Sequence, residues 1–124
     1  MRLWITGGAG FIGSACAVEA LGRGWEVTIL DTFEPTLYAP ERKQANLAWV
    51  REHGRVHFAQ TDIRDREGLE ALLAERPPEA VLHLAAVAGV RPSIEHAPRY
   101  YDINVTGTST LLEACLEAGV RRFA

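Results

Sequence analysis

A glycine-rich stretch near the N-terminus constrains the fold of this chain more than any other part of its sequence. Residues 6–13 read Thr-Gly-Gly-Ala-Gly-Phe-Ile-Gly, so that Gly7, Gly10 and Gly13 are three residues apart. A short apolar run precedes the stretch and an apolar helical pattern follows it, which predicts a tight turn from a strand into a helix. A Cβ atom would block such a turn or hold its backbone away from a ligand. The stretch therefore indicates a diphosphate site at a helix N-terminus, where the helix dipole favours negative charge.

An acidic residue follows at the distance expected for a nucleotide-binding site. Residues 1–5 and 26–30 read as short strands on either side of a helix at 11–23, and Asp31 stands at the end of the second strand. This strand-helix-strand order is that of a βαβ unit. A carboxylate roughly 20 residues after the glycines is typical of a side chain that binds the ribose of a dinucleotide. The alternative is an ordinary polar cap at a strand end, and the glycine spacing favours the ribose.

Size and composition fit a single globular domain. The chain has 124 residues, of which 48% are hydrophobic and 23% charged, and its net charge is -3. Because Lys and Arg are scattered, we expect neither nucleic acid nor membrane as a partner. No apolar run is long enough to span a bilayer, and the first run is too short for a secretory signal. Cys16 and Cys115 lie in apolar helical patterns, without metal-ligand spacing. A cytoplasmic protein is expected.

The rest of the chain alternates between strands and helices. The patterns predict helices at 41–53, 64–75 and 98–118, strands at 56–60 and 80–86, and the start of a further strand at 120–124. Nearly continuous apolar strands are typical of a parallel sheet that is buried on both faces. The sequence therefore predicts an α/β fold, a Rossmann-type doubly wound parallel sheet with strand order 3-2-1-4 and a truncated fifth strand. The fourth strand should then be an open edge, which favours a homo-oligomer or edge-strand association.

Several motifs along the chain resemble those of one known family. Besides the glycine turn and Asp31, these motifs are Asp62-Ile63, His83-Leu84-Ala85-Ala86 and Asp102-x-Asn104-x-x-Gly107-Thr108. Together they resemble the extended short-chain dehydrogenase/reductase family, in its nucleotide-sugar epimerase and dehydratase branch. Within that branch, the segment Ala88-Gly89-Val90-Arg91-Pro92-Ser93 is most similar to UDP-glucuronate 4-epimerases, with UDP-glucose 4-epimerases and 4,6-dehydratases next. The resemblance covers essentially the whole chain.

The resemblance implies a site for NAD, in an NAD-binding Rossmann domain that spans residues 1–124 and is incomplete at its C-terminus. The positions that match the cofactor-binding residues of the family are Gly7, Gly10, Phe11, Ile12, Gly13, Asp31, Thr32, Asp62, Ile63, Leu84, Ala85, Ala86 and Asn104. Asp31 would bind the adenosine ribose and repel the 2′-phosphate of NADP, so NAD is preferred. No arginine directly follows Asp31 to reverse this preference, and Arg42 and Lys43 come only later. Thr32 replaces an asparagine that is common in the family.

Some of these positions also have a structural explanation. In the family the residue at Asp62 contacts the adenine and the residue at Ile63 packs on the ring, but Asp62 could also cap the helix expected from Arg64. Asn104 would lie near the nicotinamide ribose, or its amide could support a neighbouring strand. The segment 84–86 would lie beside the diphosphate, where its small alanine side chains let the backbone approach the cofactor. The alternative is that these residues belong to the core of a strand, and this explanation fits the leucine better than the two alanines.

The catalytic motif of the family does not occur in this chain. That motif is Tyr-x-x-x-Lys, assisted by a serine or threonine, and it lies beyond the fifth strand; here the only lysine is Lys43. In the whole enzyme the tyrosine would take a proton from a sugar hydroxyl while NAD takes hydride from the same carbon, which gives a 4-keto intermediate. We therefore expect the NAD-binding portion of a nucleotide-sugar 4-epimerase, inactive alone, with a UDP-sugar as the substrate of the full-length enzyme. The alternatives are a 4,6-dehydratase fragment and a stand-alone, non-catalytic NAD-binding module.

Overall fold

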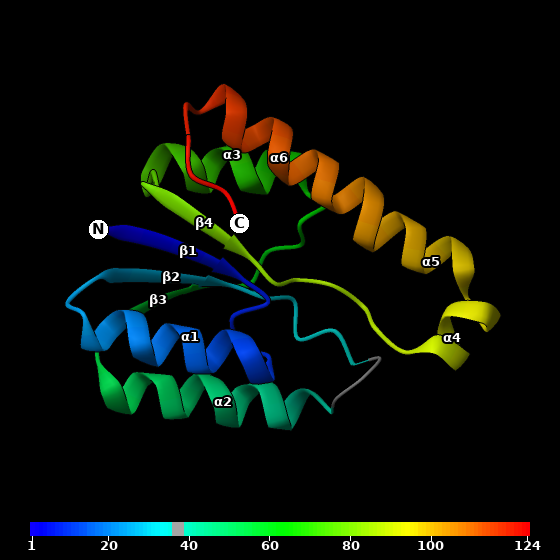
Figure 1. Ribbon diagram of the computed structural model, residues 1–124, viewed down its shortest axis with the longest axis horizontal. Helices are drawn as coiled ribbons and strands as arrows, with labels where there is room; N and C mark the ends of the chain where they lie inside the picture. The colour runs from blue at the N-terminus through cyan, green and yellow to red at the C-terminus, as the bar shows by residue number, and fades with distance from the viewer. Residues whose placement is uncertain (36–38) are drawn as a thin grey trace.

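One parallel sheet forms the centre of the molecule (Figure 1). The computed structural model describes residues 1–35 and 39–124. Its strands are β1 (Arg2–Thr6), β2 (Glu26–Leu30), β3 (Val56–Ala59) and β4 (Ala80–His83). They are hydrogen-bonded in the order β3-β2-β1-β4, with Trp4 of β1 level with Thr28 of β2 and Val81 of β4. The predicted Rossmann-type sheet with strand order 3-2-1-4 is confirmed.

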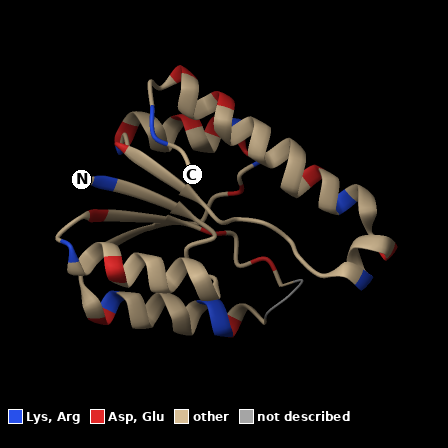
Figure 2. Ribbon diagram, viewed as in Figure 1, with Lys and Arg blue, Asp and Glu red and all other residues tan. Residues whose placement is uncertain are grey.

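Helices cover both faces of the sheet. They are α1 (Phe11–Gly22), α2 (Pro40–His53), α3 (Arg66–Glu75), α4 (Val90–Glu95), α5 (Ala97–Tyr101), the π-helical segment η1 (Asp102–Gly107) and α6 (Thr108–Glu117). In Figure 1, α1 and α2 lie against one face, and α3 and α6 against the other. Basic and acidic positions are interspersed along this ribbon (Figure 2). Among the described residues, no helix has the length and apolar character that crossing a membrane requires.

The sheet separates two hydrophobic cores. Successive residues of a strand point to opposite faces, so Leu3 and Ile5 of β1 belong to the core under α1 and α2, whereas Trp4 belongs to the core under α3 and α6. Trp4 is only 1% exposed, and its indole Nε1 donates a hydrogen bond to the main-chain oxygen of Arg76 (3.0 Å). Burial on both faces explains why the strands are nearly continuous apolar runs.

The chain after β4 differs from the prediction. The strand ends at His83 rather than at residue 86, because its neighbour β1 ends at Thr6 and the chain turns away at Gly7 in the left-handed region (φ 67°). A short helix, α4, occupies part of the loop that was expected next. The single helix expected at 98–118 is interrupted by η1, so that π-helical geometry separates α5 from α6.

The last residues of the chain run along the outer edge of β4. Phe123 forms a parallel bridge with Val81, whose N–H donates to Arg122 O (2.9 Å) and whose oxygen accepts from Ala124 N (3.0 Å). The predicted start of a further strand is therefore confirmed. As predicted, β4 is the edge strand of the four-stranded sheet, but this edge is partly covered rather than open, because His83 N also donates to Ala124 O (2.7 Å).

Candidate functional site

A cleft of about 300 Å³ opens at the carboxyl ends of the strands. It lies where the strand order reverses between β1 and β4, the position at which open α/β sheets bind ligands. All but one of the predicted site residues line it, namely Gly7, Gly10, Phe11, Ile12, Gly13, Asp31, Thr32, Asp62, Ile63, Leu84, Ala85 and Ala86. The exception is Asn104. Residues that the sequence analysis did not assign to the site include Glu34, Lys43, Thr61, Arg64, Val87, Ala88 and Ile103.

The glycine turn forms one wall of the cleft and leaves no room for side chains on its inner side. A Cβ atom on Gly13 would lie 2.4 Å from the main-chain oxygen of Gly7, and one on Gly7 would lie 2.8 Å from Ala85 N. Gly10 caps α1 and has no side chain to bind the first N–H groups of the helix. Phe11 and Ile12, in that first turn, are 78% and 63% exposed. The helix therefore presents its N-terminus to the cleft, as an anion site requires.

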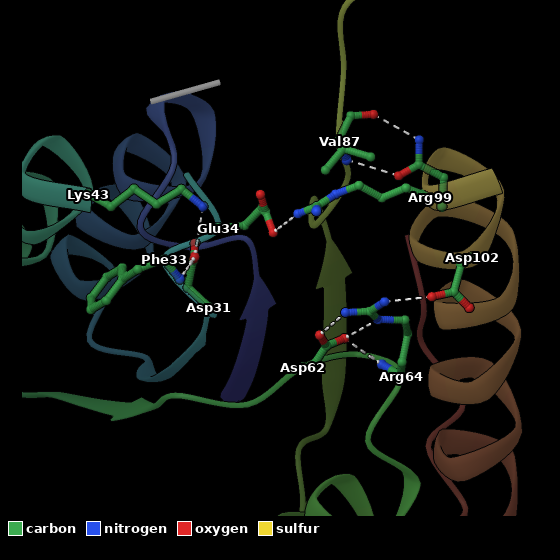
Figure 3. Close-up of polar contacts among 10 residues, drawn as sticks. Asp31, Phe33, Glu34, Lys43, Asp62, Arg64, Val87, Arg99 and Asp102 are labelled. Atoms are coloured by element: carbon green, nitrogen blue, oxygen red, sulfur yellow. Dashed lines mark hydrogen bonds and ion pairs between the residues drawn. The ribbon is translucent and has the colours of Figure 1, made fainter. Parts of the chain in front are cut away.

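Asp31 lies at the end of β2 and is almost completely buried (5% exposed). Its Oδ1 accepts hydrogen bonds from Phe33 N and from Lys43 Nζ (both 2.9 Å), and its Oδ2 accepts one from Ala9 N (3.2 Å), as Figure 3 shows in part. These bonds hold the loop after β2 and the glycine turn together. Asp31 therefore also has the structural role of a polar cap at the end of its strand. A carboxylate oxygen accepts about two bonds, and Oδ2 therefore retains capacity for a ligand hydroxyl.

Among the lining residues that the sequence analysis did not assign to the site, Lys43 lies next to Asp31. It comes from α2, lies over Asp31, and its side chain is 13% exposed. A second bond ties the same helix to the glycine turn, because Asn46 Nδ2 donates to the main-chain oxygen of Ala9 (2.9 Å). A basic group therefore does adjoin Asp31, although no arginine follows it in the sequence.

Asp62 is held by the arginine two residues further on. Arg64 donates from its main chain (2.9 Å), from Nε (3.0 Å) and from Nη2 (2.6 Å) to the Asp62 carboxylate, and its Nη1 reaches Asp102 Oδ2 (2.5 Å), as drawn in Figure 3. The side-chain bonds from Arg64 lower the pKa of Asp62. The alternative role of Asp62, as the cap of α3, is wrong: α3 begins two residues later than expected, and Asp65 caps it by accepting from Gly68 N (3.0 Å).

A chain of hydrogen bonds positions the segment after β4. Thr6 Oγ1 accepts from the N–H groups of Leu84 and Ala85 (both 3.2 Å) and lies 2.6 Å from His83 Nδ1. Because the two N–H groups occupy the acceptor sites of Oγ1, its own proton points to Nδ1 and the imidazole carries its proton on Nε2. That proton is donated to Thr108 Oγ1 (2.9 Å). Burial lowers the pKa of His83, which favours this neutral form.

Asn104 supports the next residues rather than lining the cleft. Its Oδ1 accepts from Val87 N (2.9 Å) and its Nδ2 donates to Val87 O (2.8 Å), so both amide groups are used by one residue's main chain. The structural explanation offered for Asn104 is therefore correct, although it supports a loop and not a strand. Its expected position near a nicotinamide ribose stays a prediction. Leu84 likewise packs against the core while it lines the cleft.

Sheet order, glycine turn and the carboxylate after β2 together define a Rossmann-type domain. The sequence profile of the family described as GDP-mannose 4,6 dehydratase matches residues 4–124. UDP-glucose 4-epimerase of Klebsiella pneumoniae is 37% identical over 125 residues, which cover 99% of this chain and 86% of that protein. UDP-glucose 4-epimerase 2 of Arabidopsis thaliana is 36% identical over 118 residues, which cover 94% of this chain and 33% of that protein. The chain belongs to the nucleotide-sugar epimerase and dehydratase branch of the extended short-chain dehydrogenase/reductase family.

Solved structures agree with this assignment. The Stenotrophomonas maltophila UDP-glucose 4-epimerase with bound NAD and formylated UDP-arabinopyranose superposes with a TM-score of 0.85 at 35% identity, over 99% of this chain and 35% of that one. The Thermus thermophilus UDP-glucose 4-epimerase in complex with NAD gives 0.81 at 38% identity, over 99% and 36%. The chain thus spans about a third of the length of these enzymes and of the Arabidopsis relative.

Proposed function

We propose that residues 1–124 form an NAD-binding domain of a nucleotide-sugar 4-epimerase. The observation that carries the proposal is the cleft at the switch point, where a glycine turn too tight for Cβ atoms faces the carboxylate of Asp31. Solved relatives that match nearly all of this chain contain NAD, which supports the choice of dinucleotide. A 4,6-dehydratase would use the same domain, and the description of the matching family favours that reaction as the second candidate.

Each wall of the cleft has a role in this proposal. The diphosphate of NAD would bind at the N-terminus of α1, the adenosine ribose at Asp31 and Thr32, and the adenine beside Asp62 and Ile63. The segment 84–86, which is bonded to Thr6, would contact the nicotinamide half of NAD. Asn104 would not contact NAD directly but would hold the main chain of Val87 next to this segment.

When bound, NAD would supply reversible hydride transfer at the reacting carbon of the sugar. This chain contributes the binding and orientation of that cofactor. It has no Tyr-x-x-x-Lys for the proton transfer, so we expect a UDP-sugar to be converted only by a longer protein that supplies one.

Calorimetric titration of the folded chain with NAD tests the proposal. We expect one NAD per chain, and a loss of affinity of about tenfold in Asp31→Asn, because a ribose hydroxyl then donates to a neutral amide oxygen instead of a carboxylate. Glu52→Gln is the matched control, since it makes the same change of charge at an exposed position on α2. Absence of NAD binding by a sample with native circular dichroism would refute the proposal. Interconversion of UDP-glucose and UDP-galactose by the chain alone would refute the claim that it is inactive.

A further inference from the structure

The ribose end of the cleft holds an ion pair that is largely shielded from water. The ammonium of Lys43 lies 2.9 Å from Asp31 Oδ1, with the two side chains 13% and 2% exposed. Both residues line the cleft. Charges so placed interact more strongly with each other, and with a ligand, than charges on an open surface, because solvent screens them less.

The position of Lys43 is fixed from two directions. Asp31 is held by the main-chain N–H groups of Ala9 and Phe33, and α2 is fastened to the glycine turn by the bond from Asn46 to Ala9 O. The lysine therefore projects from a helix that is anchored to the phosphate turn itself. We therefore expect the ammonium to stay beside Asp31 when a dinucleotide binds.

The other charges of the cleft are also paired. Glu34 forms an ion pair with Arg99 of α5, and Asp62 forms one with Arg64 (2.6 Å), as Figure 3 shows. Among the described residues that line the cleft, each acidic side chain thus contacts a basic one. At the ribose end of the cleft, the charges of Asp31 and Lys43 balance each other, so an additional phosphate on the ribose would not meet an unpaired carboxylate there.

We propose that Lys43 is a specificity-determining residue that weakens the rejection of a 2′-phosphate by Asp31. The inference rests on the proposed function, since it requires that the cleft bind a dinucleotide. A lone aspartate excludes NADP mainly by repulsion. Here the ammonium cancels that repulsion and can itself contact the phosphate, so the domain binds NADP as well as NAD, with only a modest preference for NAD.

The test is the ratio of the dissociation constants of NADP and NAD, measured by calorimetry on the 124-residue chain. We expect a ratio below about tenfold for the wild type, and a ratio about tenfold higher for Lys43→Met, which keeps the stem and removes the charge. Lys43→Arg should stay near the wild-type ratio. Arg42→Met is the matched control, because it removes the same charge from the exposed neighbouring residue, and its ratio should change by less than about twofold.

A salt series provides a second measurement that needs no variant. In the wild type, where Lys43 cancels the repulsion between Asp31 and the 2′-phosphate, the ratio of dissociation constants should change little between about 0.05 and 0.5 M NaCl. In Lys43→Met the ratio should fall with added salt, because salt screens the repulsion that the lysine no longer cancels. Lys43→Met with the wild-type ratio, or a wild-type ratio that falls steeply with salt, would overturn the inference while NAD binding stands. A folded chain that binds neither dinucleotide would instead overturn the proposed function.

Discussion

Replacing Gly13 by alanine tests whether close packing, rather than flexibility, explains the glycine turn. Gly13 is the third residue of α1 and needs no left-handed conformation. Its new Cβ atom would lie 2.4 Å from Gly7 O and 2.7 Å from Gly8 Cα. Both contacts are to main chain, so no side chain can rotate out of the way. Ordinary contact begins near 3.4 Å, and the turn or the helix must therefore move by about 1 Å.

Two opposing effects determine how much Gly13→Ala changes the free energy of unfolding. Alanine is about 1 kcal/mol better than glycine inside a helix, whereas an extra carbon in a tightly packed place typically costs about 1–3 kcal/mol. Because the obstacle is main chain, we expect the upper part of that range and a net loss of about 1–2 kcal/mol. Gly22→Ala, in the last position of the same helix, meets no atom within 4 Å and should gain up to about 1 kcal/mol.

Urea unfolding, followed by far-ultraviolet circular dichroism, gives the free energy of unfolding of both variants. The expected difference in the free energy of unfolding between Gly22→Ala and Gly13→Ala is about 1–3 kcal/mol. Equal stability of the two variants would show that the turn yields without cost and would refute the packing argument. NAD affinity, measured on the same samples, should fall in Gly13→Ala only.

Two further predictions concern the segment after β4. Burial lowers the pKa of His83, so its contribution to stability is present above its unfolded pKa of about 6.5 and is lost as the pH falls through that value toward the folded pKa. Urea unfolding at about pH 7.5 and 5.5 should therefore show a loss of up to about 1.4 kcal/mol per pH unit that is absent from His83→Gln; the same loss in both proteins would assign it to other groups. Asn104→Ala should lower the free energy of unfolding by about 1–3 kcal/mol, because it leaves both main-chain polar groups of Val87 without their partner. The amide of Val87 should then exchange faster with solvent, and unchanged protection would argue against that support.

Local patterns were sufficient to predict the sheet and the glycine turn. The strand order follows from short βαβ steps, and the turn is encoded by three glycines whose spacing leaves few alternatives. Twelve of the proposed positions share one cleft because parallel strands end at the same edge of the sheet, so residues that follow the strands meet there. Asp31 could be assigned to the site from the sequence because it directly follows one of these strands.

Contacts between distant segments were not predictable in this way. Lys43 meets Asp31 because α2 packs beside α1 and is bonded to the glycine turn through Asn46, and nothing next to Asp31 in the sequence marks that approach. The cap of α3 was misplaced because Asp62 and Asp65 are both suitable caps, and it is the bonding to Arg64 that engages the first of them. The π-helical segment has no sequence pattern of its own, since its residues also fit an α-helix.

That π-helical segment places one additional residue in the last helical stretch. A π turn holds one residue more than the α turn it replaces, and η1 contains Asn104, which bonds the main chain of Val87, while Leu111 of α6 stays fully buried in the core. Removing one residue from this segment, for example the half-exposed Val105, would restore an α turn, so α5 and α6 could keep their orientation to the sheet. Removing or adding a residue in an α-helical part of the stretch would instead rotate the residues on one side of it by about 100° relative to those on the other. Within this stretch, η1 is therefore the place where the number of residues can fall by one at the least structural cost.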